Sequence, residues 1–271
     1  MGDALGHAAG LLILAHVRAG AGRRALVLLH GFLGSARNLA TLARHLIDLK
    51  PDLGVVNFDL TGHGASPPLP PGADAAALAA DVLASARTLG LTPPLTLVGH
   101  SLGGRVALRA ALLEPAVIDA VTLLDIPPGP LDDGGEVARV LAVLLRMPDT
   151  FASRGQARAR LVAAGLLPDL ADWLLLNLEP AGEGFRWRID RRALADLHAR
   201  VSAEDLWPVV ESRRRWALRC IRGGASGYVS DGDARRLEAA GCPVVTIAGA
   251  GHFLHAEQPK AVADTVAGGL A

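Results

Sequence analysis

Residues 95–104 read Leu-Thr-Leu-Val-Gly-His-Ser-Leu-Gly-Gly, an apolar run that passes through Gly-x-Ser-x-Gly into a helical pattern. Strand, motif and helix in this order are typical of a nucleophile elbow, in which a tight turn lifts a serine hydroxyl to the edge of a sheet. A Cβ at Gly99 or Gly103 would collide with the neighbouring strand or helix. Ser101 would lie over a helix N-terminus, where the backbone potential favours negative charge. Ser101 is therefore the candidate nucleophile, and a glycine-rich turn with a bystander serine is the alternative.

Short apolar runs alternate with longer helical patterns along most of the chain. Strands are predicted at residues 11–17, 25–29, 55–58, 95–98, 120–124, 217–221 and 244–247, and helices at 36–49, 74–89, 102–114 and from about Glu257. Apolar, β-branched strands that alternate with helices are typical of a mostly parallel sheet. The sequence therefore predicts an α/β fold with helices on both faces of the sheet.

Residues 127–208 break this alternation. The segment is helical in pattern, shows no convincing strand, and holds three of the four tryptophans, Trp173, Trp187 and Trp207. Ligands of open α/β sheets bind beyond the carboxyl ends of the strands, so an insertion at this point would roof the site. We expect a helical cap, inserted within a single domain that spans residues 1–271. Tryptophans that only attach this segment to the sheet are the alternative.

Composition limits the classes of partner and compartment. The 271 residues carry 27 basic and 27 acidic side chains, a balance that gives no indication of a nucleic-acid partner. Cys220 and Cys242 are predicted to be buried reduced thiols, because two isolated cysteines form neither a disulfide framework nor a metal motif. No apolar run approaches the roughly 20 residues that span a bilayer. The N-terminus resembles neither a signal peptide nor a transit peptide, so we expect a cytoplasmic location.

A serine hydroxyl needs a base to remove its proton. In the elbow arrangement the base follows the last strand of the sheet. Gly249-Ala250-Gly251-His252 follows the predicted strand 244–247, and its glycines give a loop that lets an imidazole reach back to Ser101. His252 is the predicted base. His255 is expected to be structural, and His30 and His100, which flank glycine turns, are expected to brace loops through hydrogen bonds.

The candidate oxyanion hole follows an earlier strand. Strand 25–29 ends in His30-Gly31-Phe32-Leu33-Gly34-Ser35, where Gly31 lets the chain turn sharply over the sheet edge. The backbone N–H of Phe32 could then join that of Leu102 in binding an oxyanion. Backbone donors carry no side-chain signature, so this prediction depends on position alone, and an ordinary strand-to-helix turn is the alternative.

Four motifs together resemble the α/β-hydrolase superfamily: His30-Gly31-Phe32, residues 59–66, residues 99–104 and residues 249–252. Within it the chain resembles the YbfF-like esterases and the abhydrolase-domain 11 group, through residues 125–128, residues 177–178 with 185–187, and residues 221–229. The resemblance covers nearly the whole chain. It implies the α/β-hydrolase fold, a mostly parallel eight-stranded sheet with a helical cap inserted after strand 6. Asp59 and His63 match a family loop and are expected to hold loops together.

The third catalytic group is the acid that orients the imidazole. Many relatives carry it in a Gly-x-x-Asp pattern after the next-to-last strand, and here Gly223-Gly224-Ala225-Ser226 puts Ser226 at that place. The remaining candidates are Asp125 and Asp231. Asp125 ends a strand that should neighbour the strand of Ser101, and it matches the earlier aspartate of YbfF-like proteins. We favour Asp125; a simple strand-end cap is the alternative for this residue.

These residues predict a serine hydrolase that cleaves carboxylic esters or acyl thioesters through an acyl-enzyme on Ser101. Phe32, Leu102 and Phe253 would give an oily pocket, and the resemblance implies short to medium acyl chains. The predicted mechanism requires neither a metal nor an organic cofactor. Two alternatives remain: a menaquinone-pathway-type lyase on the same triad, which would need arginines such as Arg105 converging in the pocket, and a non-catalytic ligand-binding protein on this scaffold.

Overall fold

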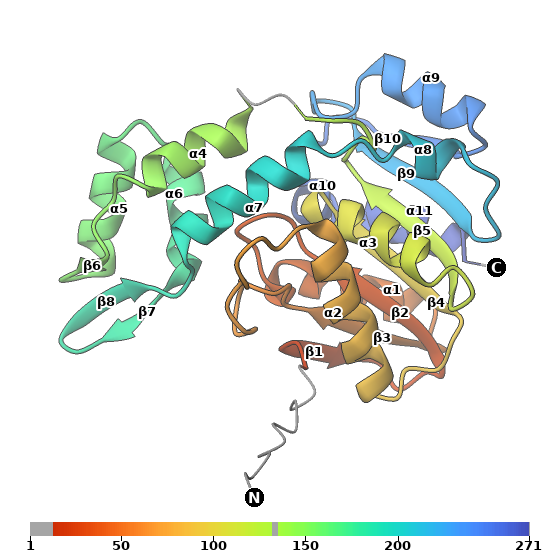
Figure 1. Ribbon diagram of the computed structural model, residues 1–271, viewed down its shortest axis with the longest axis horizontal. Coiled ribbons are helices and arrows are strands. Elements are labelled where there is room, and N and C mark those ends of the chain that lie inside the picture. The colour runs from red at the N-terminus through yellow and green to blue at the C-terminus, as the bar shows by residue number, and fades with distance from the viewer. Residues whose placement is uncertain (1–12, 132–134, 271) are drawn as a thin grey trace, which may run out of the picture.

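The computed structural model describes residues 13–131 and 135–270, and a seven-stranded sheet runs through its centre (Figure 1). Its strands are β1 (His16–Ala19), β2 (Arg24–Leu29), β3 (Leu53–Phe58), β4 (Leu95–His100), β5 (Ile118–Leu124), β9 (Ala217–Gly223) and β10 (Val244–Ile247). They are ordered β1-β3-β2-β4-β5-β9-β10. Only β1 and β3 pair antiparallel, so the predicted mostly parallel α/β sheet is confirmed.

The first part of the sheet differs from the sequence-based expectation. The described residues contribute seven strands to it, against the eight that the resemblance implied. The strand predicted at residues 11–17 lies partly outside the described residues, and β1 covers His16–Ala19 instead. β1 stops where Gly20 turns to a φ of 73°, which an extended strand does not adopt.

Two layers of helices cover the sheet because successive apolar side chains of its strands point to opposite faces. On β2, Val27 and Leu29 pack on the side of α2 (Ala75–Thr88) and α3 (Leu102–Leu113). Leu26 and Leu28 pack on the other side, with α1 (Ala40–Leu49) and α11 (Pro259–Gly268). Shorter helices complete the layers: η1 (Ala36–Leu39), α9 (Asp231–Ala239) and α10 (Leu254–Glu257). This confirms helices on both faces.

The chain between β5 and β9, here called the insertion, holds most of the remaining elements. Its helices are α4 (Glu136–Leu144), α5 (Arg154–Ala163), α6 (Pro168–Leu174), η2 (Leu175–Asn177), α7 (Arg191–Ala203) and α8 (Trp207–Glu211). It also contains a small antiparallel sheet of order β6-β8-β7, which the sequence did not indicate. The strands are β6 (Thr150–Phe151), β7 (Leu178–Ala181) and β8 (Gly184–Trp187). In Figure 1, α5, α6 and this sheet lie to one side of the main sheet, with α4 and α7 leading back towards it.

Three further findings concern the described residues taken together. Cys220 and Cys242 are free and buried, as predicted, and burial raises the pKa of the Cys242 thiol to about 12. Within residues 13–131 and 135–270, no helix is both long and apolar enough to cross a membrane. Nor do three or more His, Cys, Asp or Glu side chains of these residues gather in a way that could hold a metal ion.

Candidate active site

Ser101 lies at the junction of β4 and α3 in a strained backbone conformation, with φ 51° and ψ −117°. The two motif glycines make this turn possible. A Cβ added at Gly99 would lie 2.2 Å from the carbonyl carbon of Gly103, and one at Gly103 would lie 2.2 Å from the Leu29 oxygen. Both are far inside van der Waals contact, so α3 can pack this close to the strands only if both positions are glycine. A non-glycine residue at positive φ is uncommon and often marks a functional site.

Asp125 lies directly after β5, at the same edge of the sheet as Ser101, and its carboxylate is fully buried. Its Oδ2 lies 2.8 Å from Nδ1 of His252. The backbone N–H of Gly223 donates to Oδ1 at 2.9 Å, and the hydroxyl of Ser226 donates to Oδ2. Buried polar atoms need such hydrogen-bond partners, because an unpaired one costs free energy. The contact with Ser226 was not predicted from the sequence. The sequence showed only that this serine occupies the position where many relatives carry the acid.

The other candidate acid lies elsewhere. Asp231 begins α9, its side chain is 77% exposed, and its carboxylate forms an ion pair with Arg222 at 2.8 Å. Of the two candidates, the structure therefore brings Asp125 to His252 and leaves Asp231 in an exposed ion pair.

His252 is held from several sides in the loop that follows β10. The ring of Tyr228 stacks on its imidazole, with the centroids 3.6 Å apart and the planes within 13°. His100 hydrogen-bonds through Nε2 to the carbonyl oxygen of His252 at 2.8 Å. The loop itself is fastened where the N–H of Gly251 donates to the carboxylate of Glu257 at 2.7 Å. Sequence patterns identified His252 but not Tyr228, because stacking between segments that are distant in sequence depends on the fold.

Three more histidines surround this site and are buried: His30, His100 and His255. Burial lowers the pKa of His30 and of His255 to about 4, and it lowers that of His100 well below its usual value. All three are therefore neutral at pH 7, and they add no positive charge beside His252.

The chain after β2 passes close to Ser101. A Cβ at Gly31 would lie 2.6 Å from Nδ1 of His100 and 3.3 Å from the Cβ of Ser101, so this approach requires glycine. His30 braces the turn, since its Nδ1 bonds the Gly31 oxygen at 2.7 Å and its Nε2 accepts the Leu60 N–H at 2.9 Å. From the insertion, the amide of Asn177 donates to the Leu33 oxygen at 2.9 Å. That bond was not predicted.

Two backbone donors at the turn are left over. Neither the N–H of Phe32 nor that of Leu102 donates to another group of the described chain. Both residues line the cavity next to Ser101. Unpaired N–H groups on two sides of a serine are the arrangement that can receive an oxyanion.

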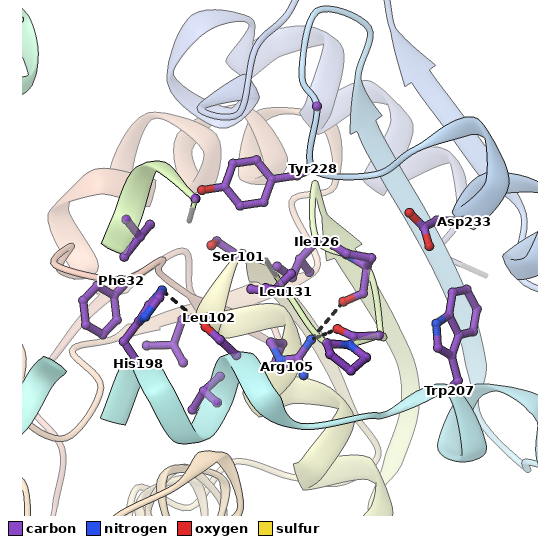
Figure 2. A pocket seen from close by; sticks show the side chains of 18 residues that line it. Phe32, Ser101, Leu102, Arg105, Ile126, Leu131, His198, Trp207, Tyr228 and Asp233 are labelled. Carbon is purple, nitrogen blue, oxygen red and sulfur yellow. Dashed lines mark hydrogen bonds between the residues drawn. The ribbon is translucent and has the colours of Figure 1, made fainter. Parts of the chain in front are cut away.

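A cavity of about 530 Å³ opens beside Ser101 between the sheet edge and the insertion. In Figure 2, Phe32 and His198 stand at one end, Trp207 and Asp233 at the other, with Ser101 and Leu131 between them. Its walls are mainly apolar, and the polar side chains among them are Ser101, Arg105, His198, Ser202, Tyr228 and Asp233. A volume of this order is typical of small-molecule sites.

Arg105 is the one arginine or lysine among the described lining residues, and its bonding is internal. It is fully buried on α3, and its Nη1 donates to the carbonyls of Pro127, Pro128 and Gly129 at 3.1, 3.4 and 2.8 Å. Its Nη2 donates to the carbonyl of Glu204, at the far end of the insertion. Burial lowers its pKa to about 10, so it stays charged at pH 7. Arg105 thus joins both ends of the insertion to the elbow helix.

A family model and several known proteins are similar to this chain. A family model described as "Alpha/beta hydrolase family" matches residues 26–265. The chain is similar to the esterase YbfF of Escherichia coli, with 30% identity over 88% of this chain and 89% of that protein. It is also similar to the sn-1-specific diacylglycerol lipase ABHD11 of Mus musculus, with 29% identity over 91% and 81%. A solved marine microorganism esterase superposes with a TM-score of 0.83 at 24% identity, over 94% of this chain and 98% of that one.

The family match covers most of the chain, and strands β3 to β10, the elbow and the loop after β10 all lie within it. The chain therefore belongs to the alpha/beta hydrolase family.

Proposed function

We propose that this protein is a serine hydrolase that cleaves carboxylic esters through an acyl-enzyme on Ser101. The observation that carries the proposal is the 2.8 Å contact between Asp125 and His252, whose imidazole lines the same small pocket as Ser101, a serine in a strained strand-to-helix turn. Carboxylate, imidazole and hydroxyl in this order are the parts of a catalytic triad. The named activities of the relatives, esterase and lipase, support the same class of reaction.

In the first half of the proposed reaction, His252 takes the proton of the Ser101 hydroxyl through Nε2 as the oxygen attacks the ester carbonyl. The N–H groups of Phe32 and Leu102 receive the negative charge that forms on the carbonyl oxygen. When the tetrahedral intermediate collapses, the bond to the alcohol oxygen breaks and His252 returns the proton to that oxygen. The alcohol leaves, and the acyl group stays on Ser101.

In the second half, water takes the place of the alcohol. His252 removes a proton from the water as it attacks the acyl-enzyme, and the same two N–H groups hold the oxyanion. Collapse releases the carboxylic acid and returns the proton to Ser101. Throughout, Asp125 accepts the Nδ1–H of His252, which fixes the tautomer and stabilises the imidazolium. A thioester can follow the same course with a thiol as the leaving group.

We propose that the insertion acts as a cap over this site. Leu131, His198, Val201 and Trp207 contribute to the wall of the 530 Å³ cavity, and they come from the insertion. The cavity walls are apolar near Ser101, which fits acyl chains of short to medium length. Asn177 supports the cap role because it ties the insertion to the chain beside Gly31.

The lyase alternative finds little support in the charges of the cavity. A polyanionic substrate would need free cationic side chains near Ser101. Arg105 is already bonded to four main-chain carbonyls. The insertion's arginines 154 and 191 likewise bind backbone carbonyls, and Arg158 pairs with Asp172. The cavity therefore favours an uncharged acyl group.

The proposal is tested by steady-state hydrolysis of simple alkyl esters, followed by titration of the acid released at constant pH. We expect many turnovers for each enzyme molecule and equal amounts of acid and alcohol as products. S-alkyl thioesters of the same acids, assayed in parallel, decide whether thioesters are substrates as well. A protein that binds these esters without turning any of them over would contradict the proposal and favour the non-catalytic alternative.

A further inference from the structure

Two pockets of very different size meet at Ser101. One is the cavity of about 530 Å³, and the other has a volume of about 30 Å³. Phe32, Ser101, Val137 and Tyr228 line both. A carbonyl carbon held at Ser101 therefore has a wide space on one side and a narrow space on the other.

His252 lines the narrow pocket and not the wide one. This placement matters under the proposed function, on which the inference rests, because the base must return its proton to the alcohol oxygen. The alcohol portion of a bound ester has to leave on the side of His252. Leu102 and Ile126 line the wide cavity and do not line the narrow pocket. The acyl chain is then directed into the wide cavity.

We propose that this enzyme is selective for esters of large acids with small alcohols. The 530 Å³ cavity would take the acyl group, within the usual range for small-molecule sites. The 30 Å³ pocket has room for about one or two water-sized groups, such as a methoxy group. The same narrow space suits the water of the second half-reaction, which also has to reach His252.

The narrow pocket is closed by aromatic and aliphatic side chains from two parts of the chain. The ring of Phe253 lies 5.4 Å from that of His252, and the ring of Trp173 lies 5.8 Å from that of Phe253. Leu170, one turn earlier on α6, completes the wall. The insertion thus limits the size of the alcohol, and Trp173 is the proposed specificity-determining residue.

Two isomeric esters test the proposal directly. Methyl octanoate and heptyl acetate have the same formula and similar hydrophobicity, and they differ in which side of the ester carries the chain. We expect kcat/KM for methyl octanoate to exceed that for heptyl acetate by at least about tenfold, because a chain that clashes with a packed wall loses transition-state binding. Equal values, or a preference for heptyl acetate, would overturn the inference.

Variants of the residues that form the wall of the narrow pocket test whether its size causes the preference. Trp173→Ala opens the narrow pocket, so the preference for methyl octanoate should fall by about tenfold through faster cleavage of heptyl acetate. Leu170→Ala provides a milder opening of the same wall, should the larger truncation reduce the amount of folded protein. Leu167→Ala is the matched control, because this leucine is 71% exposed at the start of α6 and lines neither pocket.

A substitution in the wide cavity should change the rate for esters with a long acyl chain instead of a long alcohol. Leu131→Trp should lower kcat/KM for methyl octanoate relative to methyl acetate, because the added ring fills space that the octanoyl chain needs. If Leu131→Trp instead lowers the rate for heptyl acetate relative to methyl acetate, the two pockets have been assigned the wrong way round. Failure of the wild type to cleave any ester, methyl acetate included, would refute the proposed function itself, which keeps the two failures distinct.

Discussion

At the scale of single residues, the Asp125 carboxylate collects the interactions that define the site. It receives bonds from Gly223, Ser226 and His252, and it is fully buried. Three hydrogen-bond partners hold this carboxylate in one position, which is what an imidazole needs in an orienting partner. Ser226, which stands where many relatives carry the acid, here supplies one of those donors.

Replacing Asp125 by asparagine should reduce kcat by at least about 100-fold, because an amide cannot stabilise the imidazolium and favours the wrong tautomer. Asp231→Asn is the matched control and should stay within about twofold of wild type, since that side chain forms an exposed ion pair. Steady-state ester hydrolysis at pH 8 measures both. A collapse in Asp231→Asn with Asp125→Asn active would reverse the assignment of the acid.

The bond between Ser226 and Asp125 implies that a carboxylate at position 226 would lie within reach of His252. The double variant Asp125→Asn/Ser226→Asp should therefore recover at least about tenfold of the activity lost in Asp125→Asn. The control is Asp125→Asn/Ser226→Asn, which has the same size without the charge and should show no recovery. Equal rates for the two double variants would contradict this reading of the site.

Ser101, His252 and Asp125 could be singled out from the sequence because each follows a recognisable strand and a short loop. β5 lies beside β4 in the sheet, which places Asp125 near Ser101, and the loop after β10 brings His252 to a pocket that Ser101 also lines. Tyr228 and Asn177 could not be assigned roles in this way. Their contacts, with His252 and with the Leu33 carbonyl, join segments that meet only in the folded molecule.

At the scale of elements, the main sheet was predictable and the small one was not. The central strands are buried on both faces and consist of continuous apolar runs, which give a strong signal. β7 and β8 have four residues each, include Pro180, and carry Glu179 and Arg186 opposite each other on an exposed face. Such short polar strands are stabilised by pairing with a neighbouring strand. Their sequence pattern therefore does not distinguish them from loops.

The attachment of the insertion to α3 should depend on Arg105. Arg105→Met removes a donor from four carbonyls, of which only that of Pro128 keeps another partner in the described chain, the N–H of Leu206, and we expect the free energy of unfolding to fall by about 3 kcal/mol or more. Arg158→Met removes an exposed ion pair of the insertion and should leave the unfolding midpoint close to that of the wild type. Urea unfolding compares the two, and equal losses would show that Arg105 does not have this anchoring role.

At the scale of the whole molecule, four buried histidines make stability depend on pH. Burial lowers the pKa of His63 to about 3, in addition to the lowered values of His30, His100 and His255. In the unfolded chain these groups titrate near their usual pKa of 6.5. Below that pH the unfolded state binds protons that the folded state does not, so folding loses stability as the pH falls from 6.5 towards 4.

We expect His30, His63 and His255 each to remove on the order of 2 kcal/mol of stability at pH 5 relative to pH 8. Urea unfolding at a series of pH values measures the loss, and His63→Asn should reduce its steepness between pH 6.5 and 5. A stability that is constant from pH 8 to pH 5 would show that these side chains take up protons in the folded state.

The central claim is that ester cleavage passes through a covalent intermediate on Ser101, and the most direct measurement is the mass of the protein during turnover. Rapid acid quenching of the enzyme with methyl octanoate, followed by peptide mapping, should find one octanoyl group on the peptide that contains Ser101. Ser101→Ala should carry no acyl group and should lose at least about 1,000-fold in kcat. An acyl group on another residue, or a Ser101→Ala variant that hydrolyses esters at the wild-type rate, would contradict the account.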